Sequence, residues 1–169
     1  MGIAAAGNAQ ERPRVVHVFV ALADNEYQGI VPVPKALGNG DDPARNLYWG
    51  PAFGLRTYFR NATEWKEVLH SSNPTSSALE RAVFYCVNGN VVLIADAYRG
   101  REIGQGINDF FTAAAGSFKE TPIQFRTASG KEVEAASKAD LAVYVGHDGF
   151  WILPWQRHSR TALRASGKR

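Results

Sequence analysis

The chain has 169 residues, 45% of them hydrophobic and 11% aromatic, which predicts a folded globular protein rather than a disordered one. No apolar run approaches the ~20 residues of a transmembrane helix, so we expect no membrane span. The net charge of +3 comes from residues 151–169, which hold five basic side chains and no acidic one. Residues 1–150 carry 14 basic and 16 acidic side chains, so the charge gives no support for a nucleic-acid partner.

The N-terminus leaves the cellular compartment open. Residues 1–9 are small and uncharged, as at the end of a secretory signal, but the basic and apolar regions of a signal are missing. We expect residues 1–14 to be a disordered N-terminus or a signal remnant. The protein is then cytoplasmic as written, or secreted or periplasmic if a signal peptide has been truncated. The single cysteine, Cys86, excludes an internal disulfide and does not settle the compartment.

The first predicted element is a strand at Val15–Ala23, whose nearly continuous apolar character is typical of a central position in a sheet. His17 lies inside it, and a lone histidine there is more often a satisfied core residue than a ligand. Asp24 and Asn25 end the strand. A polar segment rich in Gly and Pro follows as far as Asn46, and a connection of this length is usually functional or a lid.

This long connection contains candidate binding residues. Gln28 lies near its start, and Asn39 and Asp41 lie in the Gly38–Pro43 cluster, which by default forms a turn. A calcium loop is not expected, because it would need carboxylates over a longer register and a distal glutamate. A phosphate-binding P-loop is excluded, because Gly-Lys-Ser/Thr occurs nowhere in the chain.

The middle of the chain predicts a helix and a hairpin. Leu47–Phe59 is expected to be a helix with a broad aromatic face and Pro51 near its first turn. Arg81–Val87 and Val91–Ala97 are rich in β-forming residues, and Asn88-Gly89 between them is a favoured tight-turn pair. We therefore predict a hairpin of two strands with a tight turn at Asn88-Gly89.

Residues around this hairpin extend the candidate site. Asp96 and Tyr98 close the second strand, and we expect Asp96 to reach the same sheet edge as Asp24 and His147. Cys86 lies in the first strand, where a free thiol usually behaves as a small buried hydrophobe. The following residues predict a helix over Ile103–Ala114 that stops at Gly116, and then a second hairpin over Ile123–Glu134.

The chain is organised around Ala139–Gly149. Leu141–Val145 is a short apolar run bounded by turn residues, which predicts an inner strand of a parallel sheet. His147, Asp148 and Gly149 follow its carboxyl end, where ligands bind in open α/β sheets. His147 is therefore the first candidate for chemistry, and a loop histidine that caps or packs is the alternative.

The tail at residues 151–169 shows neither the helical nor the strand period and is rich in Trp, Arg and Ser. We interpret it as non-native, produced by a shifted reading frame. Reading from the third base of the Gly149 codon can give Phe or Leu and then Leu-Asp-Phe, which would extend His-Asp-Gly into an apolar and acidic turn. We thus expect a single, incomplete α/β domain over residues 15–150.

Several stretches resemble an uncharacterised family of bacterial proteins and together cover nearly all of residues 15–150. They are H-V-F-V-A-L-A-D-N, Q-G-I-V-P-V-P, L-G-N-G-D-D-P, N-L-Y-W-G, D-A-Y-R-G and A-V-Y-V-G-H-D-G. Longer members of the family continue into a further strand that ends in an Ala-Cys segment. A strand ending in a His-Gly-like turn and followed by a strand ending in Cys resembles the caspase-like fold of legumains and gingipains. Here Asp148 separates His147 from Gly149, which departs from that pattern.

The resemblance implies a three-layer α/β sandwich with a mostly parallel central sheet, and cysteine-hydrolase chemistry. A thiolate would attack a carbonyl, His147 would be the acid/base, and the Gly149 N–H would be an oxyanion donor. No cysteine follows His147, so the chain as written is expected to be an inactive fragment without its nucleophile, unless Cys86 reaches the site.

Two other functions stay open. The first is a non-catalytic domain whose pocket binds a small molecule or peptide through Asp24, Asn25, Gln28, Asn39, Asp41, Asp96, Tyr98 and Asp148. The second is a metal-dependent hydrolase that uses Asp24, Asp96, His147 and Asp148, whose ligand types suit zinc or manganese. The sequence has no close ligand spacing such as His-x-x-x-His, and we predict neither a metal nor a cofactor. The oligomeric state stays open.

Overall fold

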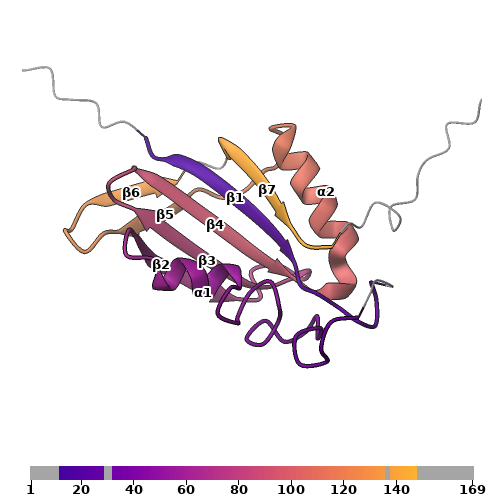
Figure 1. Cartoon of the computed structure of the whole chain (residues 1–169). Coiled ribbons are helices and arrows are strands. Elements are labelled where there is room, and N and C mark those ends of the chain that lie inside the picture. Colours follow the sequence, from indigo (N-terminus) through magenta and orange to yellow (C-terminus); the bar gives the residue numbers. More distant parts are fainter. Residues whose placement is uncertain (1–11, 29–31, 136–137, 148–169) are drawn as a thin grey trace, which may run out of the picture.

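The computed structural model of the protein describes residues 12–28, 32–135 and 138–147 (Figure 1). The elements in chain order are β1 (Arg14–Ala21), α1 (Leu55–Asn61), β2 (Trp65–Ser72), β3 (Ala78–Cys86), β4 (Val91–Tyr98), the short 3₁₀ helix η1 (Gly100–Glu102), α2 (Ile103–Ala114), β5 (Ile123–Arg126), β6 (Glu132–Ala135) and β7 (Leu141–Val145). None of the described helices has the length and apolar character that crossing a bilayer requires.

The main sheet is mixed, with the strand order β2-β3-β4-β1-β7. β1 pairs in parallel with β4 and β7, whereas β2, β3 and β4 pair antiparallel. The expected mostly parallel sheet is therefore present only in the β4-β1-β7 half. β1 is internal, as predicted. Among the described strands β7 lies at the edge, and its side chains are exposed or only partly buried, so its prediction as an inner strand depends on residues outside the described part of the chain.

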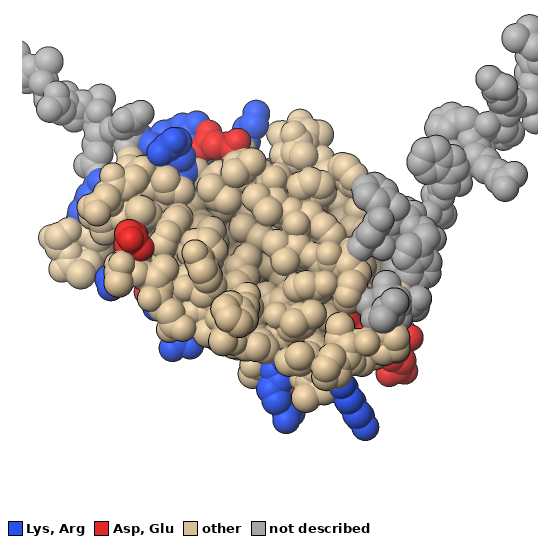
Figure 2. Space-filling model, viewed as in Figure 1, with Lys and Arg blue, Asp and Glu red and all other residues tan. Residues whose placement is uncertain are grey.

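Both faces of this sheet are covered. Side chains alternate along β1, so Val18 and Val20 pack with Trp49 on the α1 side, and Phe19 and Ala21 pack on the α2 side. The β5-β6 hairpin adds a second cluster on the α2 side. In the view of Figure 2, lysine, arginine and acidic side chains lie along the margins of the molecule, and uncharged residues cover its centre.

The predicted helix at 47–59 is only partly correct. α1 begins at Leu55, and the residues before it form turns. The turns bring backbone segments close together: a Cβ on Gly50 would lie 2.0 Å from the Ala44 carbonyl oxygen, and one on Gly54 would lie 2.4 Å from that of Trp49. A regular helix through these glycines would lose this packing. The following strand, β2, was not predicted.

The other elements follow the sequence patterns. β3 and β4 form the predicted hairpin, but the residue with a left-handed backbone in its turn is Asn90, not Asn88 or Gly89. α2 ends before Gly116, which has the positive φ of +70° typical of a helix stop. The second hairpin, β5-β6, turns at Gly130.

The long connection after β1 is anchored to the sheet by Asn46, which is fully buried. Its Oδ1 accepts hydrogen bonds from the backbone N–H groups of Ala23 (2.9 Å) and Tyr48 (3.3 Å). Its Nδ2 donates to the carbonyl oxygens of Ala23 (2.8 Å) and Asn39 (2.9 Å). The Asn46 amide thus satisfies backbone donors and acceptors that a neighbouring strand would satisfy in a sheet.

Gly40→Ala is expected to lower the free energy of unfolding by about 1–3 kcal/mol. A Cβ at this position would lie 2.1 Å from the Asp24 carboxylate and 2.6 Å from the Gly100 Cα. Gly104→Ala is the matched control, because a Cβ on this α2 residue meets nothing within 4 Å. That change should stabilise the protein by roughly 0.5–1 kcal/mol through helix propensity. Urea denaturation compares the two, and equal stability of the variants would contradict the prediction.

Candidate functional site

The carboxyl ends of β1, β4 and β7 meet at one edge of the sheet. Val20 pairs with Val145 at the end of β7, and Ala21 pairs with Tyr98 at the end of β4. The chain continues from these ends to Asp24 and His147, so both predicted residues lie at the carboxyl edge. Ligand sites in α/β sheets form at such edges because loops from neighbouring parallel strands converge there.

Gln28 joins the segments that leave these three strands, and its side chain is fully buried. Its Nε2 donates to the carbonyl oxygens of Leu22 (2.8 Å) and Gly100 (3.1 Å), which follow β1 and β4. Its Oε1 accepts a hydrogen bond from the Asp24 N–H (3.2 Å). These partners fix which end of the amide is oxygen, because a flipped amide would present donors to the Asp24 N–H.

His147, which follows β7, completes this arrangement. Its Nδ1 lies 2.9 Å from Gln28 Oε1, and its ring meets the ring of Tyr48 edge-on, with centroids 5.3 Å apart. Because Oε1 can only accept, Nδ1 must carry the hydrogen, and the neutral ring keeps its lone pair on Nε2. Partial burial lowers the pKa of His147 from its usual 6.5. The neutral form with a basic Nε2 is therefore favoured at neutral pH.

NMR titration should find the pKa of His147 below 6.5 and the neutral ring protonated at Nδ1. Since burial disfavours the charged form, folding stability should be unaffected by His147 above about pH 7 and should fall as the pH drops from 6.5 toward the lower folded-state pKa. Ring ¹⁵N shifts identify the tautomer, and a His147→Gln variant assigns the signals. A neutral ring protonated at Nε2 would contradict the predicted hydrogen bond to Gln28.

Four further predicted residues lie close together in the long connection. Asp24, Asn25, Asn39 and Asp41 line a pocket of about 400 Å³ with Tyr27 and Lys35 among its other residues. Most of their hydrogen bonds are structural. The Asp24 Oδ1 caps the N–H groups of Glu26 and Tyr27, and the Asn25 amide bonds both backbone groups of Val33.

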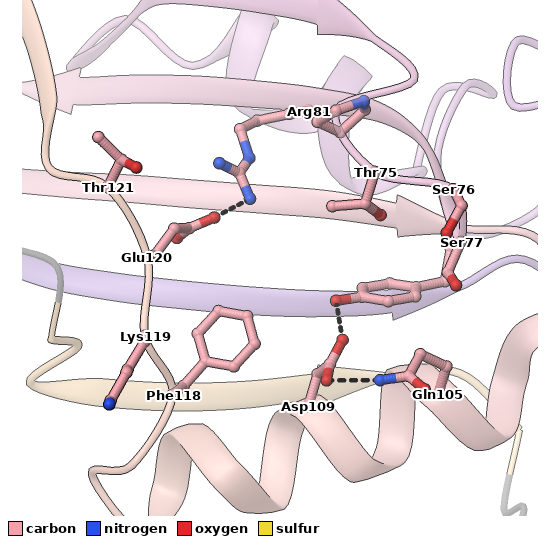
Figure 3. Close-up of a pocket in the computed structure, with 12 residues that line it drawn as sticks. Thr75, Ser76, Ser77, Arg81, Gln105, Asp109, Phe118, Lys119, Glu120 and Thr121 are labelled. Atoms are coloured by element: carbon pink, nitrogen blue, oxygen red, sulfur yellow. Dashed lines mark hydrogen bonds and ion pairs between the residues drawn. The ribbon is translucent and has the colours of Figure 1, made fainter.

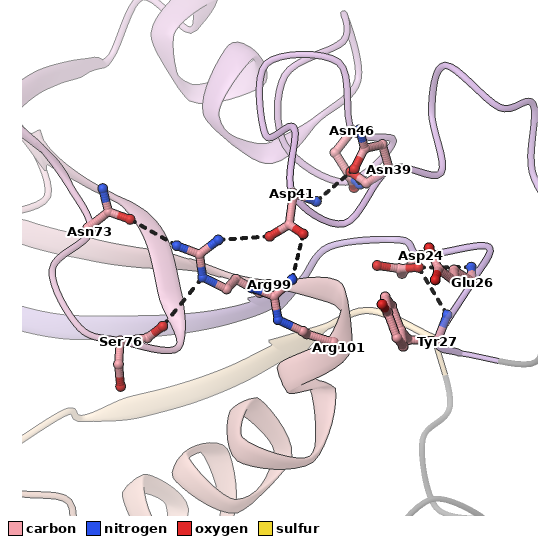
Figure 4. A network of polar contacts seen from close by, with 10 residues as sticks. All are labelled: Asp24, Glu26, Tyr27, Asn39, Asp41, Asn46, Asn73, Ser76, Arg99 and Arg101. Carbon is pink, nitrogen blue, oxygen red and sulfur yellow. Dashed lines mark hydrogen bonds and ion pairs between the residues drawn. The ribbon is translucent and has the colours of Figure 1, made fainter.

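Asp41 connects this loop to the segment after β4. Its two carboxylate oxygens accept hydrogen bonds from Arg99 (2.8 Å) and Arg101 (2.6 Å) (Figure 4). Slight burial would raise the pKa of the Asp41 carboxyl, but the two guanidinium groups outweigh it and lower the pKa. To bind a ligand as predicted, the Asp41 carboxylate would have to share its oxygens with Arg99 and Arg101.

Asp96 and Tyr98 do not join the carboxyl-edge site, and the prediction that Asp96 would do so is wrong. Asp96 pairs with Phe19, two residues before the end of β4, and its side chain contacts His17 within the sheet. The Tyr98 hydroxyl donates to Asp109 of α2 (2.8 Å), and burial raises its pKa. The side chains of both residues lie on the α2 side of the sheet, since residues on this side alternate with those facing α1.

Asp96 instead belongs to a buried charge cluster. Arg81 donates to it from Nε and Nη2, both at 2.7 Å, and His17 Nε2 lies 2.8 Å away. Arg81 also pairs with Glu120, whose other oxygen lies 3.6 Å from His17 Nδ1. Burial alone would raise the pKa of the Asp96 carboxyl, but the hydrogen bonds from His17 and Arg81 lower it. His17 is thus a satisfied core residue, as predicted.

The charge cluster also bears on the predicted metal site. Within the described part of the chain, only His17, Asp96 and Glu120 have ligand atoms close enough to hold a metal ion, all within 4.8 Å of one another. Arg81 already supplies the positive charge that both carboxylates need. Of the predicted ligand set Asp24, Asp96, His147 and Asp148, the structure does not bring the first three together, and Asp148 lies outside the described residues.

Cys86 lies far from His147. It pairs with Val91 and Trp65, at the end of the sheet opposite the carboxyl ends of β1 and β4. Cys86 therefore does not reach His147, and it cannot be the nucleophile of the predicted site. The remaining predicted residues, Asp148 and Gly149, lie outside the described residues.

Sequence reasoning missed several residues that build these sites. Asn46 and Tyr48 stand in the N-L-Y-W-G stretch, whose distinctive composition was the available signal. Arg81 and Glu120 carried no signal, because their contacts depend on strand register and on a segment without regular structure. In comparisons with known proteins, no family model, no curated protein and no solved structure matches the chain.

Proposed function

We propose that His147 is the acid/base residue of a hydrolase, that Gln28 positions it, and that the nucleophile is a cysteine outside the 169 residues. The observation that carries the proposal is the contact of His147 Nδ1 with a buried, orientation-fixed amide oxygen at 2.9 Å. An amide in this position holds the ring so that Nε2 faces the reacting groups, as in Cys-His-Asn hydrolases.

The fold supports this proposal in its placement of the pair. His147 follows a parallel strand at the carboxyl edge, and β7 has no neighbour on its outer side among the described strands. A further parallel strand there would bring its own carboxyl end next to His147. In the caspase-like arrangement that the sequence resembles, a strand in this position ends in the nucleophilic cysteine. A three-layer, caspase-like sandwich is thus part of the same proposal.

The mechanism assigns each proton to a named atom. His147 Nε2 would accept the thiol proton, and the thiolate would attack the substrate carbonyl carbon. The tetrahedral intermediate would then collapse as Nε2 returns the proton to the leaving group. Throughout, Gln28 Oε1 accepts the hydrogen bond from Nδ1–H, which is retained when the ring becomes an imidazolium. Burial lowers the pKa of His147, which favours the proton-accepting form before the reaction.

Sequencing the encoding DNA beyond codon 140 in all three frames tests the proposal first. We expect a frame that continues from Gly149 into an apolar strand followed by a cysteine. The product of that frame should hydrolyse peptidyl-aminomethylcoumarin substrates and lose the activity on treatment with iodoacetamide. Absence of a cysteine in every frame, or hydrolysis that iodoacetamide does not affect, would overturn the proposal.

A binding function is the second candidate, and the pocket of about 400 Å³ in the long connection favours it. Asp24, Asn25, Asn39 and Asp41 gather there, as the binding hypothesis predicts, although Gln28, Asp96 and Tyr98 do not, and Asp148 lies outside the described residues. Anchoring of the connection by Asn46 and Gln28 would leave the pocket preformed for a small polar ligand or peptide. This function becomes the better explanation if no frame encodes a nucleophile.

A further inference from the structure

A second pocket, of about 570 Å³, lies on the α2 side of the sheet, and the proposed hydrolase mechanism does not use it (Figure 3). It is surrounded by α2 and by two connecting segments, residues 74–77 before β3 and residues 118–121 before β5. Neither His147 nor Gln28 lines it. Its size falls within the roughly 300–1,000 Å³ of small-molecule sites.

The segment over residues 118–121 is fixed to the sheet. Glu120 pairs with Arg81 and approaches His17, so the buried charge cluster holds this wall of the pocket. Phe118 packs edge-on against the rings of His17 and Phe19, with centroids 5.5 and 5.4 Å away. The wall therefore needs no ligand to order it.

The opposite wall is held by Arg99. Its backbone N–H donates to the Ser77 carbonyl (2.9 Å), and its side chain donates to the Ser76 carbonyl (3.4 Å). The same guanidinium bonds Asn73 (3.1 Å) and Asp41 (2.8 Å), as Figure 4 shows. Because both walls are anchored by side-chain contacts, the pocket is preformed, and a ligand would not have to order its walls on binding.

The pocket offers free donors and free acceptors together. In the described part of the chain, no hydrogen bond uses Arg81 Nη1, although Nε and Nη2 are engaged. The Ser76, Ser77 and Thr121 hydroxyls likewise have no hydrogen bond to the described residues, and each can both donate and accept. Gln105 donates through its Nε2 to Asp109, which leaves its Oε1 as an acceptor.

The charged side chains around the pocket are of both signs, Arg81 and Lys119 against Asp109 and Glu120, so no single charge on a ligand is favoured. An anion would face the carboxylates of Asp109 and Glu120, which line the pocket and bond to Gln105 and Arg81 in Figure 3. A cation would face Arg81, whose guanidinium lies between Glu120 and Asp96. A hydroxyl group meets neither penalty, because it donates to a carboxylate and accepts from a guanidinium at the same time.

We propose that this pocket binds a neutral polyhydroxylated molecule of the size of a mono- or disaccharide. Its hydroxyl groups match the mixture of donors and acceptors, and the apolar C–H face of a sugar ring can pack against Phe118, which lines the pocket and is only partly buried. This assignment is independent of the hydrolase proposal, because the two sites share no residue.

Titration calorimetry and saturation-transfer NMR on the 169-residue protein test the assignment, with D-glucose, D-galactose, D-mannose and N-acetyl-D-glucosamine as probes. We expect at least one to bind with a Kd on the order of 1 mM. Asp109→Ala should weaken it about tenfold by removing a charged acceptor. Asn108→Ala, a neighbouring position on α2 outside the lining, and His147→Gln should leave the Kd unchanged.

Thermal melts of each variant verify folding, and if Asp109→Ala does not fold, Gln105→Ala takes its place, since Gln105 is exposed. Lack of binding by all four sugars at about 50 mM, a concentration at which a site with a millimolar Kd would be saturated, would overturn the proposal. So would tighter binding of inorganic phosphate or methylammonium, or sugar binding that neither variant of the lining weakens.

Discussion

Asp96→Ala is expected to lower the free energy of unfolding by about 3–5 kcal/mol, the usual cost of removing one partner from a buried ion pair. Asp96 is 2% exposed, and Arg81 and His17 both contact its carboxylate. Without it, a guanidinium and an imidazole would remain in the interior with much of their hydrogen bonding lost. Glu120 would still pair with Arg81 but lies closer to solvent. Urea denaturation at pH 7 measures the change.

An exposed ion pair provides the control for this prediction. Arg126 and Glu132 form a pair across β5 and β6 whose side chains are 67% and 77% exposed. Glu132→Ala should therefore change the stability by less than about 1 kcal/mol. If Asp96→Ala lowers the free energy of unfolding no more than this control, the buried ion pairs of Asp96 do not stabilise the fold.

The same comparison has a pH dependence with a defined sign. The pKa of the Asp96 carboxyl is lowered in the folded protein, from an ordinary value of 3.8. The folded state therefore binds fewer protons than the unfolded state at low pH, and the stabilisation from Asp96 is complete above about pH 4. It should disappear as the pH falls through the lower folded-state pKa. The stability difference between the wild type and Asp96→Asn should shrink over that interval.

His147→Gln should lower kcat by about 10²–10⁴-fold in the cysteine-containing product of the proposed reading frame, the usual contribution of a general acid/base. Gln28→Ala should lower kcat less, because the ring remains but loses the hydrogen bond that fixes its tautomer. Steady-state kinetics on a peptidyl-aminomethylcoumarin substrate measure both. KM should change little if neither side chain binds the substrate in its ground state.

The pH profile distinguishes positioning by Gln28 from a merely structural role. In the wild type, kcat/KM should stay high to below pH 6.5 on the acidic side, because burial lowers the pKa of His147. Gln28→Ala should shift the acidic limb of the pH profile of kcat/KM, whereas a purely structural loss would reduce kcat/KM equally at every pH. Tyr48→Phe retains the edge-on ring against His147 and serves as the control. Wild-type kcat in His147→Gln would contradict the assignment.

The sequence predicted the elements that carry a clear local pattern of apolar, β-forming or helically spaced residues. β1 has a continuous apolar run, the β3-β4 hairpin has β-forming residues around a turn pair, and α2 has helical spacing; Gly116 and Gly130 mark a helix end and a turn because their backbones are left-handed. β2 was missed because polar residues interrupt its pattern, as in Lys66-Glu67 and His70-Ser71. The helix at 47–59 was extended too far because its aromatic residues happen to fall at helical spacing.

The candidate site was predictable in its location but not in its contacts. The strand ends placed Asp24 and His147 at one edge, since parallel strands bring their carboxyl ends together. The partner of His147 is Gln28, which is 119 residues away in the chain, and no local spacing encodes such a pair. Asp96 was misplaced because the sequence does not show that the strand continues for two residues beyond it, nor that its side chain contacts His17 and Arg81 on the α2 side of the sheet.

The anchoring of the long connection by two buried amides has a consequence for how this protein can vary. Most loops accept insertions and deletions, because their backbone groups bond to water. Here Asn46 and Gln28 each bind backbone groups from at least two different segments, so one added residue between them would separate several bonds at once. Changes of length should be tolerated in the exposed turn of the β5-β6 hairpin and excluded between residues 32 and 46.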